Sequence, residues 1–374
     1  MAKYKVIPGG VCAAKGFSAS GVHAGFRANP NKLDLAIIKA DVRCAAAGVY
    51  TTNKVYGAPI KVDRAHLVDG HAQAVLVNSG NANTCAANGV DLANECCALV
   101  AQQLGIAAED VLPASTGVIG QKLPVEKVLD GVRRIVPELS KDKGTDAAWA
   151  IMTTDTVRKE VAYEMELSGG TVRIGAMAKG SGMIHPNMAT MLAYITTDAK
   201  VDASVLQGML KKSTDKSFNM MTVDGDTSTN DSLFLLANGA SGVAIETEED
   251  KAAFAELLDS ICMDMALRIA SDGEGATHLM VVEAYGLPTE KDAKLVARSI
   301  AGSTLFKAAL FGKDANWGRI MAAAGYSGAD VDPTKADCIL KSAAGEVVVM
   351  ENGFGTDFSE ELACLLYTSD AADE

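Results

Sequence analysis

A strand-like run, a polar loop and a helix-like run follow one another in the N-terminal third of the sequence, and this succession limits the fold most strongly. Ala74–Val77 is a short apolar run after a Gly-His turn, which is typical of a buried strand. It leads into the turn-forming residues 78–84, which predict a loop. From Asn88 to Leu104 the apolar residues recur at helical spacing, and Gly105 is a suitable stop. The pattern indicates a mixed α/β protein.

Further segments continue this mixture of strands and helices. Two pairs of strand-like runs meet at short turns that contain Ser and Gly, which predicts β-hairpins. They are Val161–Leu167 with Thr171–Ala176, and Cys338–Lys341 with Glu346–Met350. A helix is expected from Thr247 to about Ala270, with Thr247 as its N-cap and a stripe of apolar residues after it. Because strands and helices mix without a strict βαβ repeat, we expect a layered α/β (α+β) fold.

Length and composition narrow the class of protein. A chain of 374 residues favours one large domain with a smaller one, or two closely packed halves. Its 48% hydrophobic and 22% charged residues are ordinary for a soluble globular protein, and its net charge of −13 argues against nucleic acid or an anionic membrane as a partner. The sequence shows no signal peptide and no membrane-spanning run. Eight cysteines without a Cys-x-x-Cys pair indicate reduced thiols in a cytoplasmic protein rather than a metal site.

The most unusual stretch is the sequence 179–192, which reads Lys-Gly-Ser-Gly-Met-Ile-His-Pro-Asn-Met-Ala-Thr-Met-Leu. Its glycines allow close approach of the backbone, and Pro186 favours an extended or turn conformation at the residue before it. The apolar run from Met191 to Ile195 predicts a strand. A polar loop would therefore deliver Thr190 to the first position of a buried strand.

A threonine hydroxyl at that point could attack the carbonyl carbon of Ala189. The peptide bond would become an ester that water cleaves, and Thr190 would become a new N-terminus. Its α-amine has a reference pKa of about 7.7–8.0, so near neutral pH a useful fraction is free base beside the hydroxyl that it must deprotonate. From the residues alone, an ordinary threonine at a loop-to-strand boundary is the more frequent explanation of such a segment.

This segment resembles the cleavage site of the ornithine acetyltransferase (glutamate N-acetyltransferase) family, in which the chain is cut between an alanine and a nucleophilic threonine. Further blocks match the family in order, from residue 8 to about residue 360. They are Lys15–Phe17, Thr51–Asn53, Val77–Asn83, Ser115–Gly120, Ala150–Asp155, Val223–Asp231, Asp272–Thr277 and Asn316–Ile320. The resemblance therefore covers nearly the whole chain.

The resemblance implies an N-terminal-nucleophile-like αββα sandwich of the ornithine acetyltransferase and aminopeptidase type, with a smaller C-terminal α/β domain. Self-cleavage would give an α chain of residues 1–189 and a β chain of residues 190–363. Residues from 190 to about 280 would complete the main core, and residues from about 281 to 363 would form the smaller domain. The family also implies an α2β2 heterotetramer.

Catalytic roles follow from the same resemblance. Thr190 would be the nucleophile, and Thr116 with Gly117 would form the oxyanion hole. A hydroxyl group and a backbone N–H are suitable donors to a tetrahedral oxyanion, and each such donor is typically worth about 2.7–4 kcal/mol. Without the resemblance, the Ser-Thr-Gly sequence would indicate an ordinary turn.

Substrate binding is implied for Thr153, Lys179, Thr190 and Glu274. The Lys179 cation suits a substrate carboxylate, and the glycines on both sides of Glu274 leave its carboxylate open to a substrate ammonium group. Thr154 is adjacent to Thr153 and stays an alternative to it. Without the family, Lys179 would be interpreted as a surface lysine and Glu274 as a turn residue at a helix end.

The implied reaction is a ping-pong transfer of acetyl from N-acetylornithine to glutamate in arginine biosynthesis, without a metal or organic cofactor. Acetyl-CoA as a further acetyl donor stays open. Residues 224–231 are interpreted as structural or site-shaping, because the EF-hand spacing and its terminal Glu are absent. His185 is a weak candidate for a general base, because the N-terminal amine already fills that role. Two alternatives remain, a self-processing N-terminal-nucleophile aminopeptidase and an inactive amino-acid-binding module.

The C-terminal segment departs from the family. Family members continue with further strands, whereas residues 364–374 read Cys-Leu-Leu-Tyr-Thr-Ser-Asp-Ala-Ala-Asp-Glu, which resembles the translation of an adapter used in DNA sequencing libraries. We therefore expect this segment to be non-native and the smaller domain to be truncated. Missing strands would leave an unpaired sheet edge and remove part of the substrate pocket, which puts the activity of the chain in question.

Overall fold

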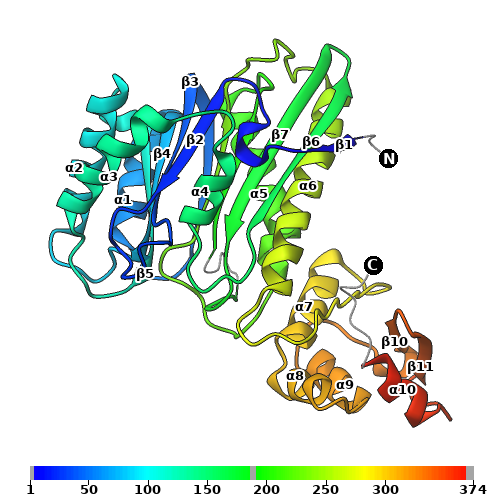
Figure 1. Cartoon of the computed structure of the whole chain (residues 1–374). Helices are drawn as coiled ribbons and strands as arrows, with labels where there is room; N and C mark the ends of the chain where they lie inside the picture. Colours follow the sequence, from blue (N-terminus) through cyan, green and yellow to red (C-terminus); the bar gives the residue numbers. More distant parts are fainter. Residues whose placement is uncertain (1–3, 186–190, 368–374) are drawn as a thin grey trace. The chain divides into compact units, whose positions relative to one another are not determined.

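The computed structural model describes residues 4–185 and 191–367 (Figure 1). Contacts between Cα atoms separate the chain into two compact units. The first consists of Met1–Asn219 and Asp226–Glu274, and the second of Met220–Gly225 and Gly275–Glu374. Each described residue with an expected catalytic or substrate-binding role lies in the first unit.

A nine-stranded sheet runs through the described part of the first unit, in the order β1-β6-β7-β8-β9-β3-β4-β5, with β2 paired to β3. Two neighbouring pairs, β4 with β5 and β8 with β9, are parallel, and the other pairs are antiparallel. The strands are β1 Tyr4–Ile7, β2 Phe17–Val22, β3 Leu35–Tyr50, β4 His71–Asn81, β5 Val111–Val118, β6 Lys159–Leu167, β7 Gly170–Lys179, β8 Leu192–Thr197 and β9 Ser232–Ala237.

The sheet forms two layers, which are described below, and helices cover the outer face of each layer (Figure 1). The α-helices of the unit are α1 Ala58–His66, α2 Gly89–Leu104, α3 Val125–Ile135, α4 Gly144–Ala150, α5 Ala203–Lys216 and α6 Glu248–Ser271. Short 3-10 helices stand at η1 Gly10–Cys12, η2 Leu67–Asp69, η3 Ala108–Asp110, η4 Val136–Glu138 and η5 Phe218–Met220. Helices α1 to α3 pack on the half of the sheet that contains β4 and β5. Helix α6 packs on β6 and β7, and α5 packs on α6 and on β3.

The strand β3 joins the two halves of the sheet. Its pairing with β4 shifts register between Lys39 and Cys44 and ends at Ala45. The first part of β3 also pairs with β2, and its second part, from Ala45 to Tyr50, pairs with β9. On β3, Ile37 points toward the helices α1 to α3, whereas Ile38 belongs to the central cluster that also contains Tyr194 of β8. The layers are therefore helices, sheet, sheet and helices, which confirms the expected αββα arrangement.

The strand β4 is longer than the sequence predicts. It continues past Val77 to Asn81, so the first half of the expected loop is strand. The polar side chains of this extension find partners inside the fold. Ser115 Oγ donates to Asn78 Oδ1 at 2.6 Å, and Ser79 Oγ donates to a backbone carbonyl of α4 at 2.7 Å. A polar sequence can therefore stay in a buried strand here, because its hydrogen bonds are satisfied by segments distant in the chain.

Other expected elements are confirmed. The helix α2 ends at Leu104, and Gly105 follows with a φ of +69°, the left-handed conformation that glycine adopts easily. The helix α6 begins after Thr247, whose hydroxyl accepts from the backbone N–H of Asp250 at 3.1 Å. The strands β6 and β7 form the expected antiparallel hairpin.

The second unit has its own core and a separate small sheet of three strands, in the order β10-β11-β12. Its elements are α7 Glu290–Gly302, α8 Thr304–Phe311, α9 Trp317–Gly325, η6 Pro333–Lys335, β10 Cys338–Ser342, β11 Gly345–Glu351, β12 Phe354–Gly355 and α10 Glu360–Leu366. Ile300, Phe306 and Val349 are buried in this core, together with Leu366 and Tyr367. The expectation of a non-native segment at 364–374 stays a prediction.

Among the helices of the described ranges, we find none with the length and apolar character needed to cross a membrane.

Phe254 of α6 offers a test of the packing between this helix and the sheet. Its side chain is 0% exposed, so Phe254→Ala should leave a cavity and lower the free energy of unfolding by about 3–5 kcal/mol. Met263 lies exposed on the same helix, and Met263→Ala should change the free energy of unfolding by less than about 0.5 kcal/mol. Urea unfolding followed by circular dichroism measures both values, and equal losses would contradict the described packing.

Candidate functional site

The structure describes most of the residues for which the sequence analysis expects a role. They are Thr116, Gly117, Thr153, Lys179 and Glu274. The expected cleavage site, Ala189 and Thr190, lies outside the described residues. The geometry of the neighbouring segments therefore has to define the site.

Thr116 and Gly117 stand near the C-terminal end of β5, where this strand pairs in parallel with β4. Thr116 is buried, and Gly117 is exposed with a φ of +132°. A Cβ atom at Gly117 would lie 2.3 Å from the carbonyl carbon of Gly80. Only glycine permits this approach of two backbones, so the chain at the expected oxyanion hole is fixed by close contact with β4.

The strand β8 begins directly after the undescribed segment, and its entry is held by a buried carboxyl group. The backbone N–H of Met191 donates to Asp231 Oδ1 at 3.0 Å. The preceding residue, Asn230, donates from Nδ2 to the carbonyl oxygen of Ser115 at 2.9 Å. Ser115 directly precedes Thr116. Two adjacent residues therefore connect the start of β8, next to the expected nucleophile, with the end of β5 that carries the expected oxyanion hole.

Asp231 is 0% exposed, and burial raises its pKa well above the usual range of an aspartic acid. This burial favours the neutral carboxyl form. The contacts of Asn230 and Asp231 agree with a structural or site-shaping role for residues 224–231. Neither residue is marked as a site residue by the sequence alone. The available signal was an Asn-Asp pair directly before an apolar strand.

Lys179 is the last residue of β7 and is only 2% exposed, which differs from the surface lysine that its residue type alone would indicate. Burial lowers the pKa of Lys179, and the nearby carboxylate of Asp155 acts in the opposite direction. A buried ammonium group needs such a counter-charge. Lys179 is therefore a buried lysine whose protonation depends on the carboxylate of Asp155.

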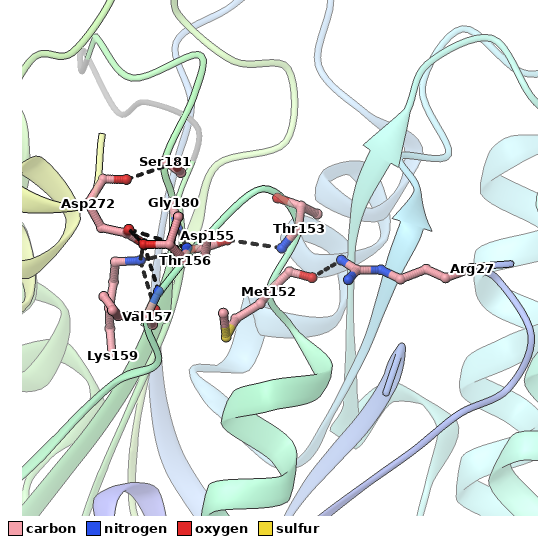
Figure 2. A network of polar contacts seen from close by, with 10 residues as sticks. All are labelled: Arg27, Met152, Thr153, Asp155, Thr156, Val157, Lys159, Gly180, Ser181 and Asp272. Atoms are coloured by element: carbon pink, nitrogen blue, oxygen red, sulfur yellow. Dashed lines mark hydrogen bonds and ion pairs between the residues drawn. The ribbon is translucent and has the colours of Figure 1, made fainter. Parts of the chain in front are cut away.

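Asp155 connects Thr153 with the segment that follows Lys179. Its Oδ2 accepts from the backbone N–H of Thr153 at 2.9 Å, and its Oδ1 accepts from the backbone N–H of Gly180 at 2.7 Å (Figure 2). Thr153 is half-buried and Thr154 is exposed, and the choice between them as the substrate contact stays open.

Glu274 reaches the same segment from its other side. Its backbone N–H donates to the carbonyl oxygen of Ser181 at 3.0 Å. A Cβ atom at Gly182 would lie 2.4 Å from the carboxylate of Glu274, so this side chain rests against bare backbone. Glu274 is exposed. The segment from Lys179 to Gly182 therefore brings together a buried cation and an accessible carboxylate, which can bind the two opposite charges of an amino acid.

His185 contributes through its backbone, because its carbonyl oxygen accepts from Thr227 Oγ1 at 2.9 Å. Searching residues 4–185 and 191–367, we find no group of three or more His, Cys, Asp or Glu side chains that could hold a metal ion.

Comparison with known proteins gives matches along almost the whole chain. The sequence model of the ArgJ family matches residues 18–370. The arginine biosynthesis bifunctional protein ArgJ of Symbiobacterium thermophilum is 50% identical over 361 residues, which cover 96% of this chain and 89% of that protein. The protein of the same name from Caldanaerobacter subterraneus subsp. tengcongensis is 47% identical over 362 residues, with shares of 96% and 89%. Among solved structures, the ornithine acetyltransferase of Mycobacterium tuberculosis complexed with ornithine is 37% identical, covers 49% of this chain and 98% of that chain, and has a TM-score of 0.46.

Two glycine substitutions distinguish a backbone contact from a side-chain contact in this site. Gly117→Ala would drive a methyl group into the backbone of Gly80 at a positive φ, so the free energy of unfolding should fall by about 2 kcal/mol or more. Gly182→Ala meets only the end of the Glu274 side chain, which can rotate away, so its change should stay below about 0.5 kcal/mol. Chemical unfolding of both variants measures the difference, and a larger loss for Gly182→Ala would contradict the assignment.

Proposed function

The chain belongs to the ArgJ family, and we propose that it transfers the acetyl group of N2-acetyl-L-ornithine to L-glutamate, giving ornithine and N-acetylglutamate in arginine biosynthesis. The observation that carries this proposal is 50% identity to a bifunctional ArgJ protein over 96% of the chain. Its relatives carry the word bifunctional in their names, and on that ground the proposal includes acetyl-CoA as a second acetyl donor to glutamate.

Thr190 is proposed as the nucleophile after self-cleavage. Its hydroxyl oxygen attacks the carbonyl carbon of Ala189, the C–N bond breaks, and the resulting ester is hydrolysed by water. The products are an α chain that ends at Ala189 and a β chain that begins with the free amine of Thr190. That amine then takes the hydroxyl proton during attack on a substrate, so nucleophile and base come from one residue.

Acetyl transfer proceeds in two steps. The Thr190 hydroxyl attacks the acetyl carbonyl of N-acetylornithine, the amide bond breaks, and ornithine leaves with the proton. The amine of glutamate then attacks the acetyl ester and leaves as N-acetylglutamate. Thr116 and Gly117 are proposed to stabilise the oxyanion of each tetrahedral intermediate. The hydrogen bonds of Asn230 and Asp231 support this assignment, because they connect the chain at Thr116 with the residue after Thr190.

Lys179 is proposed to bind the substrate carboxylate, and Glu274 the substrate ammonium group. Thr153, with Thr154 as the alternative, and Thr190 complete the proposed contacts. The burial of Lys179 supports its role, because a charge–charge contact strengthens when water is excluded. We further propose that the cleaved chains assemble as an α2β2 heterotetramer in the cytoplasm, and that no metal or organic cofactor takes part.

Thr190→Ala tests the nucleophile. The wild type should separate into two fragments on denaturing electrophoresis, with masses that place the cut between Ala189 and Thr190. Thr190→Ala should remain one chain, because it lacks the attacking hydroxyl, whereas Thr190→Ser keeps a hydroxyl and should still be cut. Intact-mass analysis reads all three. A folded wild-type protein that stays uncut would rule out self-cleavage at this site.

Acetyl transfer and hydrolysis differ in the molecule that accepts the acetyl group, which is glutamate in transfer and water in hydrolysis. Ornithine release from N-acetylornithine should depend on added glutamate, and N-acetylglutamate should appear in equal amount. If ornithine forms at the same rate without glutamate, the chain is a hydrolase of the aminopeptidase kind and the transfer proposal fails.

The lowered pKa of Lys179 predicts a pH dependence of substrate binding. A carboxylate binds the protonated lysine, so KM for N-acetylornithine should rise as the pH increases through the lowered pKa, which lies below the value of about 10.4 of an ordinary lysine. Lys179→Met should raise KM at pH values where the wild-type lysine is protonated, and it should remove this dependence. Lys179→Arg keeps its charge above pH 12, so any binding it retains should not weaken over this range. Steady-state KM between pH 7 and 10 measures this, and an unchanged alkaline rise in both variants would refute the role of Lys179.

A further inference from the structure

Lys159, the first residue of β6, is the centre of a buried charge network to which neither the sequence analysis nor the proposed function assigns a role. Its side chain is 1% exposed. Its ammonium nitrogen lies 2.8 Å from Asp155 Oδ1 and 2.5 Å from Asp272 Oδ2 (Figure 2). Burying a charged group costs several kcal/mol, and well-packed apolar residues often stabilise a core as well as a buried ion pair does. Stability alone therefore does not explain this buried ion pair, and the hydrogen bonds of its two carboxylates indicate what Lys159 does.

On one side of Lys159, Asp155 fixes two backbone segments. It accepts the N–H groups of Thr153 and Gly180, as described above. The residue before Thr153 is held as well, because the Arg27 guanidinium donates to the carbonyl oxygen of Met152 (Figure 2). The proposed contacts Thr153 and Lys179 are thus anchored through one carboxylate.

On the other side of Lys159, Asp272 fixes the segment that leads to Glu274. Its carboxylate accepts from the backbone N–H of Thr156 at 3.0 Å and from the hydroxyl of the same residue. Its backbone carbonyl accepts from Ser181 Oγ at 2.7 Å, and the backbone N–H of Glu274 returns to the Ser181 carbonyl at 3.0 Å. The proposed ammonium contact is thus anchored through the second carboxylate.

Charge balance keeps both carboxylates ionised. Burial raises the pKa of Asp155, but the neighbouring cations Lys179 and Lys159 outweigh it and leave the pKa below the usual range. Burial acts in the same direction on Asp272, and its hydrogen bonds from Lys159 and Thr156 again give a lowered pKa. Two ionised carboxylates in a buried region repel each other, and the ammonium group between them converts that repulsion into two ion pairs.

We propose that Lys159 is a positioning residue for the amino-acid substrate, which sets the spacing between the carboxylate-binding Lys179 and the ammonium-binding Glu274 by joining Asp155 to Asp272. This inference rests on the proposed function and concerns the same site. Lys159 acts through the substrate contacts and touches no reacting atom. Thr116 and Gly117 lie on β5, outside these contacts, so the network governs binding of the amino-acid part rather than the acetyl transfer itself.

Lys159→Met tests the proposal, because methionine keeps an unbranched side chain of nearly the same length and removes the charge. KM for N-acetylornithine and KM for glutamate should both rise about tenfold or more, whereas kcat should change less than about threefold and self-cleavage should still occur. Lys211→Met is the matched control. Lys211 pairs with Asp215 at 3.0 Å on the surface, where its side chain is 70% exposed, and its removal should leave both constants unchanged.

A double-mutant cycle separates positioning from a general loss of structure. If Lys159 acts through Glu274, the rise in KM caused by Lys159→Met should shrink in a Glu274→Gln background. Additive effects on KM, or a loss of kcat at unchanged KM, would overturn the proposal.

A second variant decides the case in which Lys159→Met does not fold. Ser181→Ala removes only the hydroxyl that bonds to the Asp272 carbonyl and should raise KM about threefold at unchanged kcat. An unchanged KM in Ser181→Ala would then overturn the proposal. A wild-type enzyme that transfers no acetyl from N-acetylornithine to glutamate would instead refute the proposed function, which is measured before any variant.

Discussion

Polar groups that are buried at the ends of the central strands must find partners inside the protein, and this requirement determines where the candidate site forms. At the start of β9, Asn230 donates to Ser115 and Asp231 accepts from Met191. Asn230 also donates to the carbonyl oxygen of Ala82 at 2.6 Å, which adds the segment after β4. Loss of either side chain would leave buried N–H or C=O groups without a partner, at a cost of about 1–3 kcal/mol each. The site is therefore maintained by the same hydrogen bonds that complete the core.

Elements with local signals could be predicted from the sequence. The helix α6 has an N-cap at Thr247 and an apolar stripe, and the hairpin of β6 and β7 has a Ser-Gly-Gly turn, so short-range chemistry defines both. The extension of β4 could not be predicted in this way. Its polar residue Asn78 is satisfied by Ser115, which lies 37 positions away in the chain, and only the folded structure brings the two together.

In the candidate site, too, contacts between residues far apart in the chain could not be predicted from the sequence. The prediction of self-cleavage at Thr190 depends on the resemblance to a family, because Ala-Thr pairs are common and indicate little by themselves. The network around Lys159 was missed because its partner Asp272 lies 113 positions away. Lys159 is followed by the charged Glu160, so the sequence alone would place it in solvent. Its burial appears only when β6 and the end of α6 are seen together (Figure 2).

The order of strands in the sheet has a consequence for the two chains that self-cleavage would produce. Strands β1 to β7 precede residue 190 in the sequence, and β8 and β9 follow it. In the sheet, β8 and β9 lie between β7 and β3, so the later strands are inserted into the middle of the earlier ones. Separating the fragments would break the hydrogen bonds of β7 with β8 and of β9 with β3 at the same time. The cut would thus sever the covalent chain but leave the two polypeptides joined in one sheet, and their dissociation would require unfolding of that sheet.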